Sequence, residues 1–94
     1  MPAIGVLQIE IHIPHARSIK DRRNVVRSFK SKMRVKHNVS VAEVDDQMLM
    51  NRASICVVTV SSSKDFAEKV LEAVERDAEA LLGDMFESAV VDFV

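Results

Sequence analysis

Cysteine is nearly absent from this chain of 94 residues, which has Cys56 alone. A single thiol cannot form a disulfide within its own chain, so nothing in the sequence points to an oxidising compartment. Cys56 lies in the apolar run 55–60, where we expect a small buried side chain. A nucleophilic cysteine would need an activating base nearby, and no local pattern supplies one.

Long apolar runs are also missing. No stretch reaches the roughly 18 apolar residues of a membrane-spanning helix. The first residues carry no basic segment, and Gln8, Glu10 and His12 interrupt the first apolar stretch, so we expect no signal peptide and a cytoplasmic location. Repeats, linkers and low-complexity tracts are lacking as well, and the length suits one folded domain, residues 1–94.

Aromatic residues are few: the chain has four Phe, no Tyr and no Trp. Proteins that bind single-stranded RNA on a sheet stack the bases on exposed aromatic side chains. The sequence therefore argues against this kind of RNA-binding platform.

The sequence does contain a clear succession of strand and helix patterns. Apolar residues alternate with polar ones over 4–13 and predict a strand that Pro14 ends. Helical spacing over 18–36 predicts a helix with Ser18 as its N-cap. We also predict strands over 39–45, 52–61 and 86–94, a turn over 46–51, and a second helix over 64–82, with Phe66 and Leu81 on its core face and Gly83 as its C-cap.

The resulting order, βαββαβ, predicts an α+β fold of the ferredoxin-like plan. Right-handed crossovers place both helices on one face of a four-stranded antiparallel sheet and leave the other face uncovered. The predicted third and fourth strands carry apolar residues on both of their sides. Because an exposed apolar sheet face usually meets a partner, we expect a homodimer, formed through this face or through pairing of sheet edges.

Three segments of the sequence resemble a known family. They are RSIKDRRNVVRSF (17–29), NVSVAEVD (38–45) and QMLMNRAS (47–54), and they resemble the YlxP-like family of small bacterial proteins of unknown function. The resemblance implies a ferredoxin-like fold. Family genes often lie near genes for translation and ribosome maturation, which implies work linked to RNA. The resemblance supplies no catalytic residues, and Arg17 stands where family members often have His or Ser.

Charge is distributed unevenly along the chain. Residues 18–37 hold eight Lys and Arg against one acid, whereas residues 64–94 hold nine acids against three bases. On the first helix, five cations fall within an arc of roughly 80° and could follow a phosphate backbone. The alternative is a solvated helix face, and a pI near 6.3 argues against strong nucleic-acid binding by the whole molecule. The five candidate nucleic-acid-binding residues are Lys20, Arg23, Arg27, Lys30 and Arg34.

Arg22 differs from these five because it falls within the apolar stripe of the same helix. A buried arginine needs a carboxylate partner, and Glu43 or Asp45 could supply one. We expect a structural ion pair between helix and sheet. An anion-binding site with Arg22 at its mouth is the alternative.

A possible catalytic or metal-binding pair is Glu10 with His12, which share one side of the first strand. The three histidines, His12, His15 and His37, lack the spacing of any known ligand motif. We therefore expect no catalytic residues, no metal and no cofactor.

Three functions follow from these features. The first is a non-enzymatic module that binds RNA or a ribonucleoprotein through the basic row. The second is a homo-oligomeric structural or regulatory protein that binds another protein through its basic and acidic helices. The third is a small enzyme that uses Glu10, His12 or Arg22. We expect no membrane partner.

Overall fold

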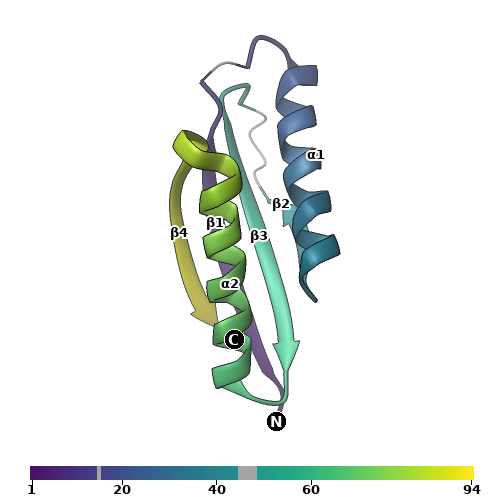
Figure 1. The fold of residues 1–94 in the computed structure, drawn as a ribbon, viewed down its shortest axis with the longest axis vertical. Helices are drawn as coiled ribbons and strands as arrows, with labels where there is room; N and C mark the ends of the chain where they lie inside the picture. The colour runs from purple at the N-terminus through teal and green to yellow at the C-terminus, as the bar shows by residue number, and fades with distance from the viewer. Residues whose placement is uncertain (15, 45–48) are drawn as a thin grey trace.

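The computed structural model describes residues 1–14, 16–44 and 49–94. Strands β1 and β3 pair along ten positions at the centre of an antiparallel sheet with the order β2-β3-β1-β4. Both helices cover the same face of this sheet (Figure 1), so the predicted ferredoxin-like arrangement is confirmed. The elements are β1 (Ala3–His12), α1 (Ile19–Lys36), β2 (Ser40–Glu43), β3 (Arg52–Ser61), α2 (Lys64–Leu82), the 3-10 helix η1 (Gly83–Met85) and β4 (Phe86–Phe93).

Local sequence signals explain where the helices begin and end. Ser18 precedes α1, and its side chain accepts a hydrogen bond from the Asp21 amide. Ser63 caps α2 in the same way through the Phe66 amide. Gly83 ends α2 with a φ of 56°, a left-handed conformation that glycine adopts without steric cost. Within the described ranges, neither helix is both long and apolar enough to cross a membrane.

The core lies between the helices and the inner face of the sheet. Leu7, Ile9 and Ile11 of β1 are fully buried there. Gly5 occupies the same row, and a Cβ atom at this position would lie 2.8 Å from Cδ1 of Leu71, so α2 packs close to β1 at this point. The remaining core includes Val26, Phe29 and Met33 of α1, Ala53, Ile55 and Val57 of β3, and Leu71, Val74 and Ala78 of α2.

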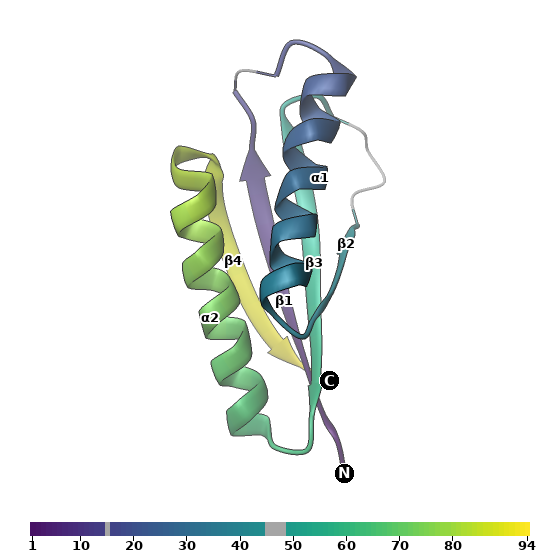
Figure 2. The ribbon, with the colours of Figure 1, turned by 45° about the vertical axis from the view of Figure 1, so that its right-hand side comes forward.

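Two residues that we placed on the core face of α2 lie elsewhere. Phe66 is 61% exposed in the first turn of the helix, and Leu81 is 38% exposed. The buried residues are Ala67, Leu71, Val74, Ala78 and Leu82, so the face that meets the sheet is rotated from the predicted one. The side of α2 that carries Leu81 borders a groove between the two helices. Figure 2 shows the two helices side by side and separated on one face of the sheet.

Candidate functional site

The five cations predicted to bind nucleic acid form one row on α1, which we call the basic ridge: Lys20, Arg23, Arg27, Lys30 and Arg34. Four of them are exposed and Lys30 is half-buried. From Lys20 to Arg34 the row rises by 14 residue steps of helix, or about 21 Å at 1.5 Å per residue. Consecutive members are three or four residues apart, so each step along the helix axis is about 4.5–6 Å.

The ridge lies on the side of α1 that faces strand β2 and away from α2. Arg34 shows this placement, because its Nη2 atom donates a hydrogen bond to the backbone oxygen of Val41 in β2 at 2.7 Å. Strand β2 is at the edge of the sheet and pairs with β3 alone. This hydrogen bond engages a carbonyl group at the sheet edge that would otherwise be free to pair with another strand.

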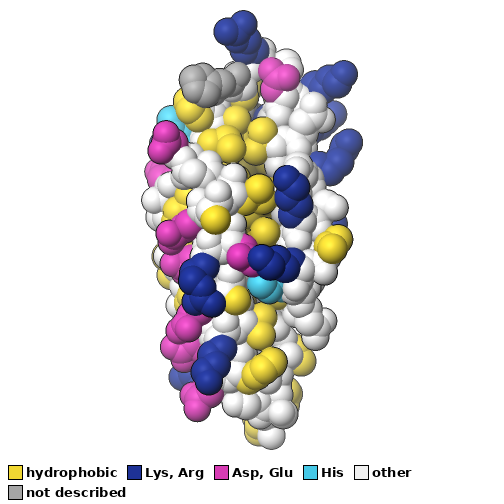
Figure 3. Space-filling model, in the orientation of Figure 1, with side chains coloured by type: hydrophobic (Ala, Val, Ile, Leu, Met, Phe, Trp, Pro, Cys, Tyr) yellow, Lys and Arg dark blue, Asp and Glu magenta, His cyan; other side chains and the backbone are white. Residues whose placement is uncertain are grey.

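The ridge cations are unpaired in the described part of the chain, where none of the five belongs to an ion pair. Figure 3 shows Lys and Arg side chains projecting from the outer side of α1 and acidic side chains gathered along α2. The two helices thus give the molecule a positive and a negative flank.

Arg22 lies inside the protein, with an exposed fraction of 1%. Its Nη2 atom forms an ion pair with Glu43 Oε1, and its Nε atom donates to the backbone oxygens of Leu49 at 2.6 Å and Arg52 at 3.1 Å. Asp45, the other carboxylate that we considered, lies outside the described residues. The geometry favours a structural ion pair over an anion site, because the guanidinium group of Arg22 is buried and a dissolved ligand could not reach it.

The open face of the sheet carries Gln8, Glu10 and His12. Glu10 accepts hydrogen bonds from the side chains of Gln8 and Ser54. No hydrogen bond joins Glu10 to His12 in the described part of the chain, although both residues belong to the outward-facing register of β1. Those described residues also contain no cluster of three or more His, Cys, Asp or Glu side chains suited to a metal ion.

The other half of the open face is apolar. Val60 and Val90 are 62% and 66% exposed there. Cys56 is half-buried on this face rather than buried in the core as expected, because it pairs with Gln8 in the outward-facing register of β1 and β3. A shallow depression of about 380 Å³ lies between β1 and β4, lined by Val6, Gln8, Glu10, Ser88, Val90, Asp92 and Val94.

A cluster that the sequence did not reveal ties the end of α1 to the middle of α2. Asp77 Oδ2 lies 2.6 Å from His37 Nε2, and Asp77 Oδ1 lies 3.1 Å from Lys36 Nζ. The hydrogen bonds from His37 and Lys36 hold the pKa of the Asp77 carboxyl below its usual range. These residues are far apart in the sequence and belong to no motif, so only the packing of the helices brings them together.

Comparison with known proteins places the chain in a family. The family model described as "Protein of unknown function (DUF503)" matches residues 4–91. The chain belongs to this family. It is 35% identical over 71 residues to "Uncharacterized protein YlxP" of Bacillus subtilis (strain 168), an alignment that covers 76% of this chain and 77% of that protein. The resemblance to the YlxP-like family is therefore confirmed.

Similar solved structures agree on the fold. The de novo designed protein Foldit4 superimposes with a TM-score of 0.62 at 14% identity, over 100% of this chain and 97% of that one. A dimeric ferredoxin-like protein of unknown function from Thermobifida fusca YX gives a TM-score of 0.50 at 15% identity, over 97% and 90% of the two chains. At these identities the likeness concerns the fold alone.

Proposed function

We propose that this protein is a non-enzymatic binding module that holds folded RNA by its phosphate backbone along the basic ridge of α1. The observation that carries the proposal is the ridge itself: five cations in line on one flank, with no carboxylate partner among the described residues. Cations in such a row can each neutralise a phosphate and release its counterion.

The positions of the aromatic side chains indicate which kind of RNA the ridge would bind. The four Phe residues are Phe29, in the core, Phe66 on α2, and Phe86 and Phe93 in the inward-facing register of β4. The open face of the sheet therefore offers no aromatic ring on which a base could stack. A ridge of cations without stacking residues fits the backbone of a duplex or folded RNA better than a single strand.

Electrostatics on the rest of the molecule would orient the RNA rather than strengthen its binding. The chain has a net charge of −1, and the acidic residues of α2 lie on the opposite flank from the ridge. Phosphates approaching α2 would be repelled, so the ridge is the one surface that we expect to contact RNA. The ridge fits a DNA backbone as well, and the choice of RNA follows the family resemblance.

Charge reversal tests the proposal. The double variant Arg23→Glu/Arg27→Glu should weaken binding of a duplex RNA at least tenfold in a fluorescence anisotropy titration at low salt, and a duplex DNA should be titrated in parallel. The matched control is Lys69→Glu/Arg76→Glu, which makes the same change of charge on exposed positions of α2. Equal losses in the two variants would show that net charge, and not the ridge, governs binding.

A second candidate function is a homodimer formed through the open face of the sheet. The strands β1 to β4 have 10, 4, 10 and 8 residues, and each residue covers about 3.3 Å by 4.8 Å of sheet, so two such faces would bury roughly 1,000 Å² in total. This area is about the minimum for a specific interface. Exposed Val60 and Val90 provide the apolar contacts. The Thermobifida fusca protein is described as dimeric, which supports a dimer in proteins of this fold.

The sheet edges favour contact through the face over edge pairing. At one edge Arg34 occupies the carbonyl of Val41, and at the other the Asp92 side chain accepts the backbone N–H of Phe93 at 2.9 Å. Sedimentation velocity at micromolar concentration should show a dimer that Val90→Glu dissociates, while Val35→Glu, an exposed position on α1, leaves it intact. A monomer in the unmodified protein would reject this candidate.

A further inference from the structure

Apolar side chains line the space between the two helices and are not covered by other parts of the described structure. One hollow of about 550 Å³ is lined by Met33 and Val35 of α1 and by Ala80 and Leu81 of α2, among others. Leu81 also lines a second hollow of about 310 Å³, which continues past Val25, Phe29, Leu82 and Met85. The two hollows share Leu81 and follow one another along the seam between the helices, which we call the groove, and Figure 3 shows hydrophobic side chains along this seam.

The size and walls of this groove suit a small elongated ligand. From Lys36 to Val25 it follows 11 residues of α1, or about 16 Å. Its volume lies within the range of about 300–1,000 Å³ that small-molecule sites occupy. Two of its apolar side chains, Met33 and Met85, are flexible and adapt to different apolar shapes.

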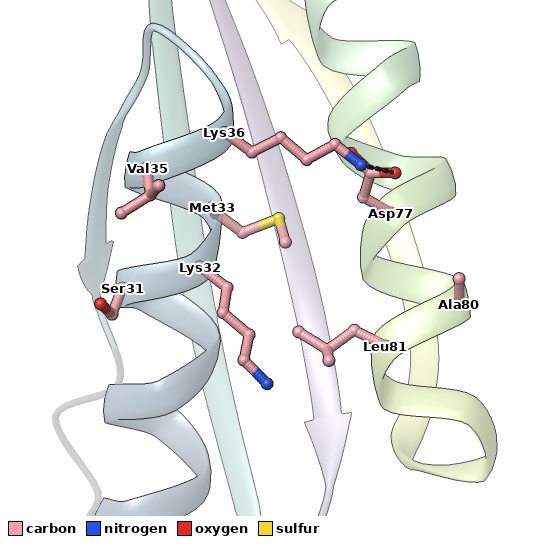
Figure 4. Close-up of a pocket in the computed structure, with 8 residues that line it drawn as sticks. All are labelled: Ser31, Lys32, Met33, Val35, Lys36, Asp77, Ala80 and Leu81. Carbon is pink, nitrogen blue, oxygen red and sulfur yellow. Dashed lines mark ion pairs between the residues drawn. The ribbon is translucent and has the colours of Figure 1, made fainter.

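One cation in the groove lacks a carboxylate. Lys36 is paired with Asp77, which also contacts His37, so the acid on the α2 wall is already neutralised. Lys32 forms no ion pair among the described residues. In Figure 4 the Lys32 side chain extends into the space between the helices, toward Leu81. An anionic group placed at Lys32 would therefore meet an unopposed positive charge beside an apolar surface.

From this arrangement we infer that the groove binds an elongated amphiphile that has an apolar chain and a single carboxylate. The carboxylate pairs with the Lys32 ammonium group, because that cation is uncommitted and borders the apolar floor. The chain covers Leu81 and runs toward Val25 and Met85, where the second hollow removes it from water. The site lies on the opposite side of α1 from the basic ridge, so it does not depend on RNA binding.

Three probes of one chain length test the inference by amide NMR: decanoate and decylammonium, each kept below its micelle concentration, and decanol, kept below its solubility limit in water. We expect decanoate to bind about fivefold more tightly than decanol and decylammonium to bind most weakly, as one exposed ion pair would give. Lys32→Glu should reverse the order of the two charged probes. Leu81→Gln should weaken all three, and it should preserve the fold because Leu81 is partly exposed.

The matched control is Lys69→Glu, which makes the same change of charge at an exposed position outside the two hollows and should leave the order of the probes unchanged. Three results would overturn the inference. These are equal binding of the three probes, chemical shift changes centred on the open sheet face, and binding above the micelle concentration only. A change of oligomeric state in Leu81→Gln, measured by sedimentation, would assign the groove to a second copy of the chain and would also overturn it.

Discussion

His37 Nε2 and Asp77 Oδ2 lie 2.6 Å apart, although the two residues are separated by 40 positions in the sequence. Together with Lys36, this contact joins the end of α1 to α2 across one end of the groove. Elsewhere in the described residues, no ion pair links the two helices. We therefore expect the charge of Asp77 to help hold the two helices in their relative position at this end of the groove.

Replacing Asp77 should destabilise the protein in a pH-dependent way. Its pKa in the folded protein is lowered from the ordinary value of 3.8, so its contribution is present above that value and is lost as the pH falls through the lowered one. We expect Asp77→Ala to lower the free energy of unfolding by about 0.5–1 kcal/mol at pH near 7. Urea unfolding of wild type and variant should converge as the pH falls below the lowered pKa, and Glu79→Ala, an exposed position on α2, should change little. A pH-independent difference would contradict this account.

Replacing only one partner of the Arg22–Glu43 ion pair should destabilise the protein more than replacing both partners. Glu43→Ala leaves the guanidinium of Arg22 buried without its carboxylate, and we expect a loss of about 2–4 kcal/mol in the free energy of unfolding. Arg22→Met keeps much of the side-chain volume without the charge. In the double variant Glu43→Ala/Arg22→Met the second substitution should recover part of the loss, because the uncompensated buried charge is gone. Chemical denaturation of the three variants measures this coupling, and additive losses would show that the pair is energetically unimportant.

A side chain at position 5 should disturb the contact between β1 and α2. Gly5→Ala places a Cβ atom 2.8 Å from Leu71 Cδ1, and overpacking of this kind costs about 1–3 kcal/mol. Adding Leu71→Val shortens the opposing side chain and should restore part of the loss. Thermal unfolding of the single and double variants tests this pair. If Gly5→Ala is as stable as wild type, the close approach of α2 to β1 is not as tight as described.

Much of the fold could be predicted because the local patterns agree with the tertiary structure. Alternation over 4–13, the Ser18 cap and the Gly83 stop each depend on neighbouring residues, and the observed β1, α1 and α2 begin and end within a residue of the predicted bounds. The apolar stripe of α2 was harder to place. The helix carries apolar residues on more than one of its sides, so its sequence alone did not indicate which side packs on the sheet. The observed packing buries Leu82 and leaves Phe66 exposed.

The sequence predicted the candidate site only where the positions of its residues follow from the periodicity of a single helix. The positions of the ridge cations follow from helical periodicity, and the burial of Arg22 follows from its place in the apolar stripe. The Asp77 cluster and the groove depend on the distance between two helices that pack on different strands. No pattern within either helix encodes that distance. The sequence equally does not reveal that Lys32, which forms no ion pair among the described residues, borders the groove.

The salt dependence of RNA binding by the unmodified protein tests the central claim most directly. Five cations that each neutralise a phosphate should give a plot of log K against log salt concentration with a slope of about −3.5 to −4.5. Arg23→Gln should reduce the magnitude of this slope by about one phosphate contact and leave the fold unchanged, since Arg23 is exposed. Binding that is absent at low salt, or that does not change with salt, would contradict the assignment of the ridge as an RNA surface.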